Sequence, residues 1–294
     1  MIFVWIAVGL GLRRSAASAA DFARLNRVII WAPLPATILL ALHGLRWDPS
    51  YWIPVSMAWI VFIASVGLFA AAGRLFGWSA STVGALVMTA GLGNTSFLGF
   101  PLLRALYGER VIPIAVLTDQ PGSFLVLSTL GLLAASYYSS RRTSIVGRMV
   151  RFPPLWALLA AVLLRPFPLP LEKALRLCAS ALIPLALISV GGALSFDRAH
   201  LSRERRPLAL GFLYKLVLAP AAMALLLVVC LHRRGEAVRI TLVEAAMGPM
   251  ITGAIVAVEH GLDAELCSLM VGAGVPICLI TVPLWAKLLE RFGI

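Results

Sequence analysis

A succession of apolar runs, most of them close to 20 residues long, sets the limits on what this chain can fold into. A helical stretch of about 20 apolar residues spans the hydrocarbon core of a bilayer, which is about 30 Å thick. Ten such spans would use about 200 of the 294 residues, and the remainder would supply only short loops and tails. The sequence therefore predicts an integral membrane protein, without room for a separate soluble catalytic or nucleotide-binding domain.

Composition and charge agree with a membrane location. Only 13% of the residues are charged, which is about half of the share that is typical of soluble proteins. In a soluble protein the net charge of +12 would suggest nucleic-acid binding. Here the basic residues gather between the apolar runs, where anionic lipid headgroups are their natural partners. We therefore expect membrane lipid, and no nucleic acid, as a partner.

The apolar runs form two groups of five on either side of a basic stretch. We expect a first five-helix repeat in residues 1–137, a basic cytoplasmic linker in 138–152 and a second five-helix repeat in 153–294. The predicted fold class is an all-α membrane protein with ten transmembrane helices. These helices are expected at about 1–12, 25–44, 52–76, 83–107, 111–137, 153–168, 174–195, 207–231, 238–259 and 264–289.

The two halves show a weak internal similarity in the second helix of each. Arg27 and Asp48 recur 149 residues later as Arg176 and Asp197. Because five helices is an odd number, a duplicated second half enters the membrane from the opposite side. The sequence therefore predicts a 5+5 inverted repeat, an architecture that is common among secondary transporters.

The orientation in the membrane and the length of the first helix are inferred from short stretches of sequence. The arginine clusters in 138–152 and 196–206 favour the inner side of a cytoplasmic membrane for both loops, with both termini outside. Residues 1–12 would reach only about 18 Å as a helix. Either the first helix is short or the chain starts further upstream, and we favour the second alternative.

The fourth and ninth predicted helices each contain a cluster that breaks helical hydrogen bonding. The fourth has glycines and polar residues from Gly91 to Pro101, and the ninth has Gly248 and Pro249. Asn94 and Pro249 each lie 11 residues into their helix, about 16 Å deep, near the middle of the bilayer. Paired interruptions at corresponding positions are the best pointer in a sequence to the binding site of a transporter.

These residues also carry a family resemblance. The run from Gly93 to Pro101, followed by Leu106 to Glu109, resembles the fourth-helix signature of the auxin efflux carrier family of permeases. Residues 259–263 and the stretch 25–42 are similar to its ninth and second helices. The resemblance implies the ten-helix inverted repeat of the wider group of bile-acid and arsenite carriers, with broken helices 4 and 9 crossing. It also implies transport of organic carboxylates such as auxin, malate or malonate, and the short linker is similar to that of the bacterial members.

From the breaks and the resemblance we predict a site for a small organic anion where helices 4 and 9 cross. Hydrogen bonds from Asn94, Thr95 and Ser96, together with half-helix N-termini that point to the midplane, would hold a carboxylate. The full set of expected substrate-binding residues is Asn94, Thr95, Ser96, Pro101, Gly248, Pro249 and Thr252.

Three ionisable residues lie inside predicted spans, where a charge is costly and is a functional candidate by default. Asp119 and Glu244 could carry a coupled proton, and Lys215 could attract an anionic substrate or neutralise Asp119. Each of the three could equally form a structural ion pair, and Lys215 could extend towards water. No cysteine pair or histidine group has the spacing of a metal or redox site, so no cofactor or metal is expected.

Other function classes find less support. The sequence contains neither the helix motif of a zinc protease nor a serine elbow, so an intramembrane enzyme is not indicated. Nothing resembles a repeated carbonyl-lined filter, and an inverted repeat suits alternating access better than an open channel. We therefore predict a secondary transporter, proton-coupled or uniport, with a sodium-coupled organic-anion symporter as the alternative. Homodimer formation is left open.

Overall fold

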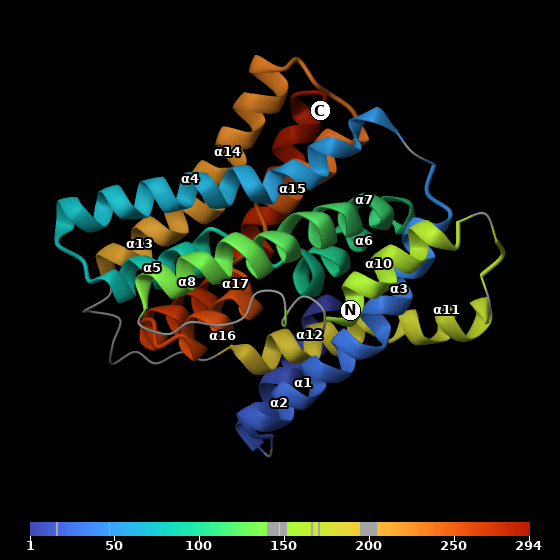
Figure 1. Cartoon of the computed structure of the whole chain (residues 1–294), viewed down its shortest axis with the longest axis horizontal. Coiled ribbons are helices and arrows are strands. Elements are labelled where there is room, and N and C mark those ends of the chain that lie inside the picture. Colours follow the sequence, from blue (N-terminus) through green and yellow to red (C-terminus); the bar gives the residue numbers. More distant parts are fainter. Residues whose placement is uncertain are drawn as a thin grey trace.

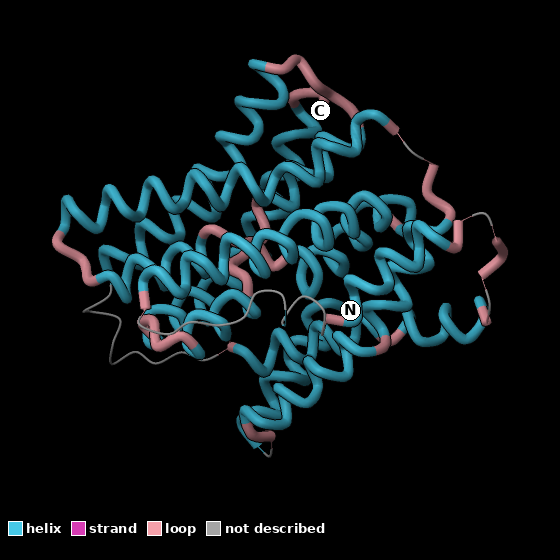
Figure 2. The backbone as a smooth tube through the Cα atoms, in the orientation of Figure 1, coloured by secondary structure: helices cyan, strands magenta, loops and turns pink. Residues whose placement is uncertain are grey.

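The computed structural model describes residues 1–15, 17–46, 48–139, 147, 152–165, 167–169, 171–194 and 205–294. Within these ranges the regular secondary structure is helical, apart from one isolated bridge between two backbone segments (Figures 1 and 2). The prediction of an all-α membrane protein is therefore confirmed. Six helical segments are long and apolar enough to cross a membrane, and these are Ala19–His43, Pro49–Phe76, Glu109–Tyr138, Glu172–Ala193, Arg205–Cys230 and Ala264–Arg291.

The helices follow the predicted ranges closely. In the first half they are α1 (Ile2–Ser15), α2 (Ala19–Trp31), α3 (Pro33–His43), α4 (Trp52–Phe76), α5 (Ala80–Ala90), α6 (Phe100–Tyr107), α7 (Ile112–Leu117) and α8 (Leu132–Tyr138). In the second half they are α10 (Pro153–Leu163), α11 (Glu172–Ser180), α12 (Leu182–Ala193), α13 (Arg205–Leu213), α14 (Ala219–Ala224), α15 (Glu236–Ala245), α16 (Ile251–Glu259) and α17 (Ala264–Arg291). Wider helical turns join several of them, including Thr95–Gly99, Thr118–Phe124 and Tyr214–Leu218.

The largest difference from prediction lies at the start of α2. The helix begins at Ala19, whereas the apolar run alone predicts a start near residue 25, because a polar turn caps it. The Ser18 side chain accepts a hydrogen bond from the backbone N–H of Asp21, and the Asp21 carboxylate accepts one from the backbone N–H of Ser18 at 2.9 Å. This reciprocal cap stabilises a polar first turn that hydropathy does not detect. Most of the linker 138–152 and the arginine cluster before Arg205 lie outside the described residues.

The helices gather into two bundles (Figure 1). In the first, here called the peripheral bundle, α1 packs along α12, and α3 packs against α10 and α11. The second, here called the crossing bundle, contains α4 to α8 and α13 to α17. It also contains both interrupted helices.

Glycine lets the peripheral bundle pack closely. A Cβ atom on Gly9 would lie 2.0 Å from the backbone oxygen of Ile188, and one on Gly191 would lie 2.1 Å from that of Ile6. Small residues of this kind allow membrane helices to bring their backbones together and gain van der Waals contact. Arg13 adds a hydrogen bond of 2.5 Å to the carbonyl of Gly192.

Candidate functional site

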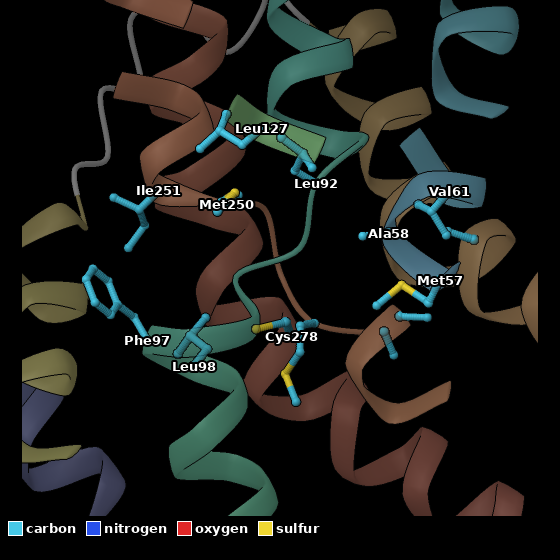
Figure 3. Close-up of a cluster of buried hydrophobic side chains, with 14 of the residues drawn as sticks. Met57, Ala58, Val61, Leu92, Phe97, Leu98, Leu127, Met250, Ile251 and Cys278 are labelled. Carbon is cyan, nitrogen blue, oxygen red and sulfur yellow. The ribbon is translucent and has the colours of Figure 1, made fainter. Parts of the chain in front are cut away.

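The two predicted breaks meet inside the crossing bundle. Helix α5 ends at Ala90 and α15 ends at Ala245, and the extended segments that follow them lie side by side (Figure 3). Gly93 and Pro249 form an antiparallel bridge. The N–H of Asn94 donates to the carbonyl of Gly248 at 2.9 Å, and the N–H of Met250 donates to that of Leu92 at 3.1 Å.

This pairing explains how an unwound backbone survives at the depth of the bilayer. Lipid cannot satisfy free N–H and C=O groups, so irregular backbone is tolerated only where protein or a watery cavity covers it. Each break here supplies hydrogen-bond partners for the backbone of the other. Glycine and proline at these positions keep both segments out of the helical conformation. The crossing is therefore a fixed point of the fold, with two half-helices starting from it.

Asn94 caps one of these half-helices. Its side-chain Oδ1 accepts a hydrogen bond of 3.2 Å from the N–H of Phe97, at the start of the segment that continues into α6. The residue is only 3% exposed. Its Nδ2 group has no hydrogen-bond partner in the described structure. A buried, unused amide donor is costly, and a ligand that accepts a hydrogen bond would remove that cost.

A cluster of hydrogen bonds surrounds Asp119, which lies in the wide helical turn Thr118–Phe124. The hydroxyl of Thr95 donates to Asp119 Oδ1 at 2.5 Å, and Gln120 Nε2 donates to Asp119 Oδ2 at 2.6 Å. Ser96 also interacts with this carboxyl group. Thr95 and Ser96 therefore approach the acid from the fourth-helix break, so that the predicted substrate-binding and coupling residues form one network on this side of the crossing.

A small cavity lies between the peripheral and crossing bundles at this network. Its volume is about 30 Å³, which is room for about one or two water molecules. Ser96, Asp119, Gln120 and Thr252 provide its polar lining, and the apolar lining comes from Ile30, Leu34, Phe97, Phe124, Leu127, Phe152 and Met250. The two bundles would have to separate here to admit an organic acid.

Lys215, in the wide turn Tyr214–Leu218, extends to the end of α15, where Glu244 lies, and neither residue lines the cavity. Lys215 Nζ donates to the carbonyl of Ala245 at 3.0 Å, at the partly negative C-terminal end of that helix. Both side chains are at most 1% exposed. The charge of Lys215 acts on Glu244, and so does that of Asp119. Neither carboxylate oxygen of Glu244 has a hydrogen-bond partner among the described residues.

Two glycines of the fourth-helix break make room for this buried charge pair. A Cβ atom on Gly93 would lie 3.1 Å from Lys215 Nζ, and a Cβ on Gly99 would lie 2.6 Å from Glu244 Oε2. The break therefore contacts both charges directly through its backbone. Any change in the charge of Glu244 or Lys215 acts on the crossing itself.

The remaining predicted residues take different positions around the crossing. Thr252 lines the cavity from the first turn of α16, whereas Pro101 is buried in the first turn of α6. Gly248 contributes its backbone carbonyl, and its hydrogen atoms face α17, since a Cβ there would lie 2.8 Å from Cys278 Sγ. Sequence reasoning missed Gln120. An amide next to an acid inside an apolar run was the signal that could have identified it.

We expect Asn94→Ala to weaken the binding of an organic anion by about 1–3 kcal/mol, the cost of one unmet buried polar contact. The loss of the cap is expected to lower stability by about 1 kcal/mol as well. Thermal-shift titration of the purified protein measures both quantities. Thr89→Val is the matched control, because its buried hydroxyl bonds within α5 to the carbonyl of Ala85. A folded Asn94→Ala variant with wild-type affinity would contradict this role.

Comparison with known proteins places the chain among transporters. A family described as membrane transport protein matches residues 1–286. An uncharacterized transporter of Methanothermobacter thermautotrophicus is 29% identical, with 92% of this chain and 89% of the relative covered. The uncharacterized transporter YfdV of Escherichia coli is 22% identical, with 93% and 90% covered. A protein of Oryza sativa named probable auxin efflux carrier component 5a is 30% identical over 44% of this chain and 34% of its own length.

Proposed function

Since this chain belongs to the membrane transport protein family, that of the auxin efflux carriers, we propose that it is a secondary transporter of small organic anions. The anion would be a carboxylate, bound where the two interrupted helices cross. Membrane transport follows from the family, and the multi-pass helical structure agrees with it. The substrate class and the location of its site are our inference from the geometry of the crossing.

The observation that carries the proposal is an unused buried donor at a paired helix break. Asn94 Nδ2 lacks a partner in the part of the chain that the structure describes, and it lies beside the bridge between Gly93 and Pro249. Half-helices begin on both sides of the bridge, at Thr95 and at Ile251, and each directs a partly positive N-terminus towards the crossing. Two such termini and an amide donor favour an anionic guest.

We further propose that the chain crosses the membrane ten times, as two inverted five-helix repeats in 1–137 and 153–294. Six spans are long, and the other four would be α1, the interrupted pair α5 and α6, α10, and the interrupted pair α15 and α16. With the basic linker 138–152 in the cytoplasm, both termini would lie outside. The expected location is the cytoplasmic membrane, with a homodimer as a further possibility.

A proton is the coupling ion that we favour, with Asp119 as its carrier. Asp119 lines the cavity between the bundles, so a proton on it can respond to bundle separation. Sodium coupling, the alternative, needs oxygen ligands around a free cation. At Glu244 and the carbonyl end of α15, the ammonium group of Lys215 already supplies the positive charge. This arrangement favours a proton over sodium.

Uptake into proteoliposomes tests this coupling. We expect Asp119→Asn to abolish accumulation driven by a proton gradient, while exchange of substrate across the membrane continues. Thr118→Val, whose buried hydroxyl bonds to the carbonyl of Ile114 within its own helix, is the control and should still accumulate substrate. Full accumulation by both Asp119→Asn and Glu244→Gln would rule out a carboxylate proton carrier, and accumulation driven only by a sodium gradient would establish the alternative.

A further inference from the structure

Gln120 presents an unsatisfied acceptor to the cavity between the bundles. Its Nε2 is engaged by Asp119 at 2.6 Å. This contact uses the amide nitrogen as the donor, so the amide oxygen is directed elsewhere. Gln120 Oε1 has no partner within the described ranges, although the residue is only 1% exposed. The cavity it lines is large enough for a water molecule, so water or a ligand could donate to this oxygen.

The polar lining of the cavity is therefore divided by its chemistry. Asp119 and Gln120 form an acceptor side, where the Ser96 hydroxyl is directed to Asp119. Asp119 in its ionised form would repel a carboxylate placed against it. Thr252 comes from a different element, the first turn of α16, where the partial charge of the helix end is positive. A ligand that satisfies both sides has a negative group and a hydrogen-bond donor.

We propose that the substrate is an organic acid that carries a hydroxyl, N–H or ammonium group close to its carboxylate, and that Gln120 Oε1 accepts a hydrogen bond from this donor. The inference rests on the proposed function, because it assumes that an organic acid occupies this cavity. It adds the second recognition element. The carboxylate faces the N-terminal turn of α16, and the donor faces Gln120 and Asp119. A plain acid of the same shape leaves Gln120 Oε1 unsatisfied, or strands a water there, and binds more weakly.

Matched acids test the proposal on the purified full-length protein. Dissociation constants are measured by thermal-shift titration for propanoate, lactate and alanine, for succinate, malate and aspartate, and for phenylacetate and mandelate. Within each set only the group beside the carboxylate changes. In the set that fits best, we expect the hydroxy or amino acid to bind roughly tenfold more tightly than the unsubstituted acid. The reason is that the substituted acid donates a hydrogen bond to the buried Gln120 Oε1, whereas the unsubstituted acid leaves this acceptor without a partner.

Variants at Gln120 assign the preference to this residue. Gln120→Leu and Gln120→Met both remove the acceptor. Methionine keeps the length of the side chain, so Gln120→Met replaces Gln120→Leu if the leucine variant does not fold. Either should reduce the preference to within about twofold, because only one hydrogen bond distinguishes the acids. Ser123→Ala is the control. It lies in the same wide turn, is fully buried and does not line the cavity, so the preference should persist.

Each result has a separate meaning. Equal affinity for the plain and substituted acids of a binding set would overturn the donor requirement and leave the transport of organic acids intact. A preference that survives in both Gln120 variants would overturn the assignment to Gln120. If no acid of the three sets binds, the proposed function itself fails.

Discussion

Lys215→Met is expected to destabilise the protein strongly, and adding Glu244→Gln is expected to restore most of the loss. Lys215 is the cation whose charge acts on Glu244, and both side chains are at most 1% exposed. Removing one partner of a buried charge pair leaves an uncompensated charge and costs about 3–5 kcal/mol. For a chain of this size that corresponds to a fall in Tm of roughly 10 °C. In the double variant neither member of this pair leaves its partner's charge behind, so most of this penalty should disappear.

Scanning fluorimetry of the single and double variants in detergent measures this coupling, with Lys287→Met as the control because Lys287 is exposed on α17. Protonation of Glu244 would remove the stranded charge, so the Tm deficit of Lys215→Met should shrink at acidic pH. Identical melting temperatures for Lys215→Met and the double variant would mean that the two charges do not compensate each other. The same variants also bear on transport, because Gly93 and Gly99 bring the break into contact with both charges.

Much of this fold follows from hydropathy and from helix-breaking residues. Apolar runs predict the positions of the helices, because no other regular structure satisfies a single-span backbone in lipid, and six of the helical segments are long and apolar enough to cross a membrane. Proline and glycine predict the interruptions near Asn94 and Pro249 for the same reason. The start of α2 shows the limit of the approach, since Ser18 and Asp21 extend the helix through a cap rather than through hydrophobicity.

The division of the site into two parts could not be predicted from the sequence. Asp119, Lys215 and Glu244 look alike as isolated charges in apolar runs, and their spacing along the chain says nothing about which of them share a pocket. The structure joins Asp119 to Thr95 and Gln120 at the cavity, and it joins Lys215 to the end of α15. These contacts depend on the rotation of each helix about its axis, which packing between helices decides.

The backbone pairing at the crossing was likewise beyond sequence reasoning in its detail. Two breaks at equal depth predict a shared location, but not that Asn94 would bond to Gly248 and Met250 to Leu92. Pairing of this kind requires α5 and α16 to approach each other at a fixed height. One glycine controls that approach, and its substitution is the most direct test of how closely the crossing must fit.

Gly253→Ala is expected to abolish transport and to destabilise the protein, although alanine has a higher helix propensity than glycine. The added Cβ would lie 2.4 Å from the backbone oxygen of Met88 in α5, and a backbone atom cannot move aside as a flexible side chain can. Helix α16 must therefore shift by about an ångström, which strains the hydrogen bond from the Met250 N–H to the Leu92 carbonyl within the paired breaks. Overpacking of this kind costs about 1–3 kcal/mol, and displacement of a binding group by about 1 Å can reduce activity a hundredfold.

Gly67→Ala in α4 provides the matched comparison, because a Cβ there meets nothing within 4 Å. The same chemical change should be neutral or stabilise by about 0.5–1 kcal/mol at this position, since alanine loses less conformational entropy in a helix. Opposite signs of the change in Tm for the two variants, with transport lost only in Gly253→Ala, are therefore the expected result. Wild-type transport by Gly253→Ala would mean that α5 and α16 can separate at Met88 without disturbing the paired breaks, so that their close packing is not what holds the substrate site in shape.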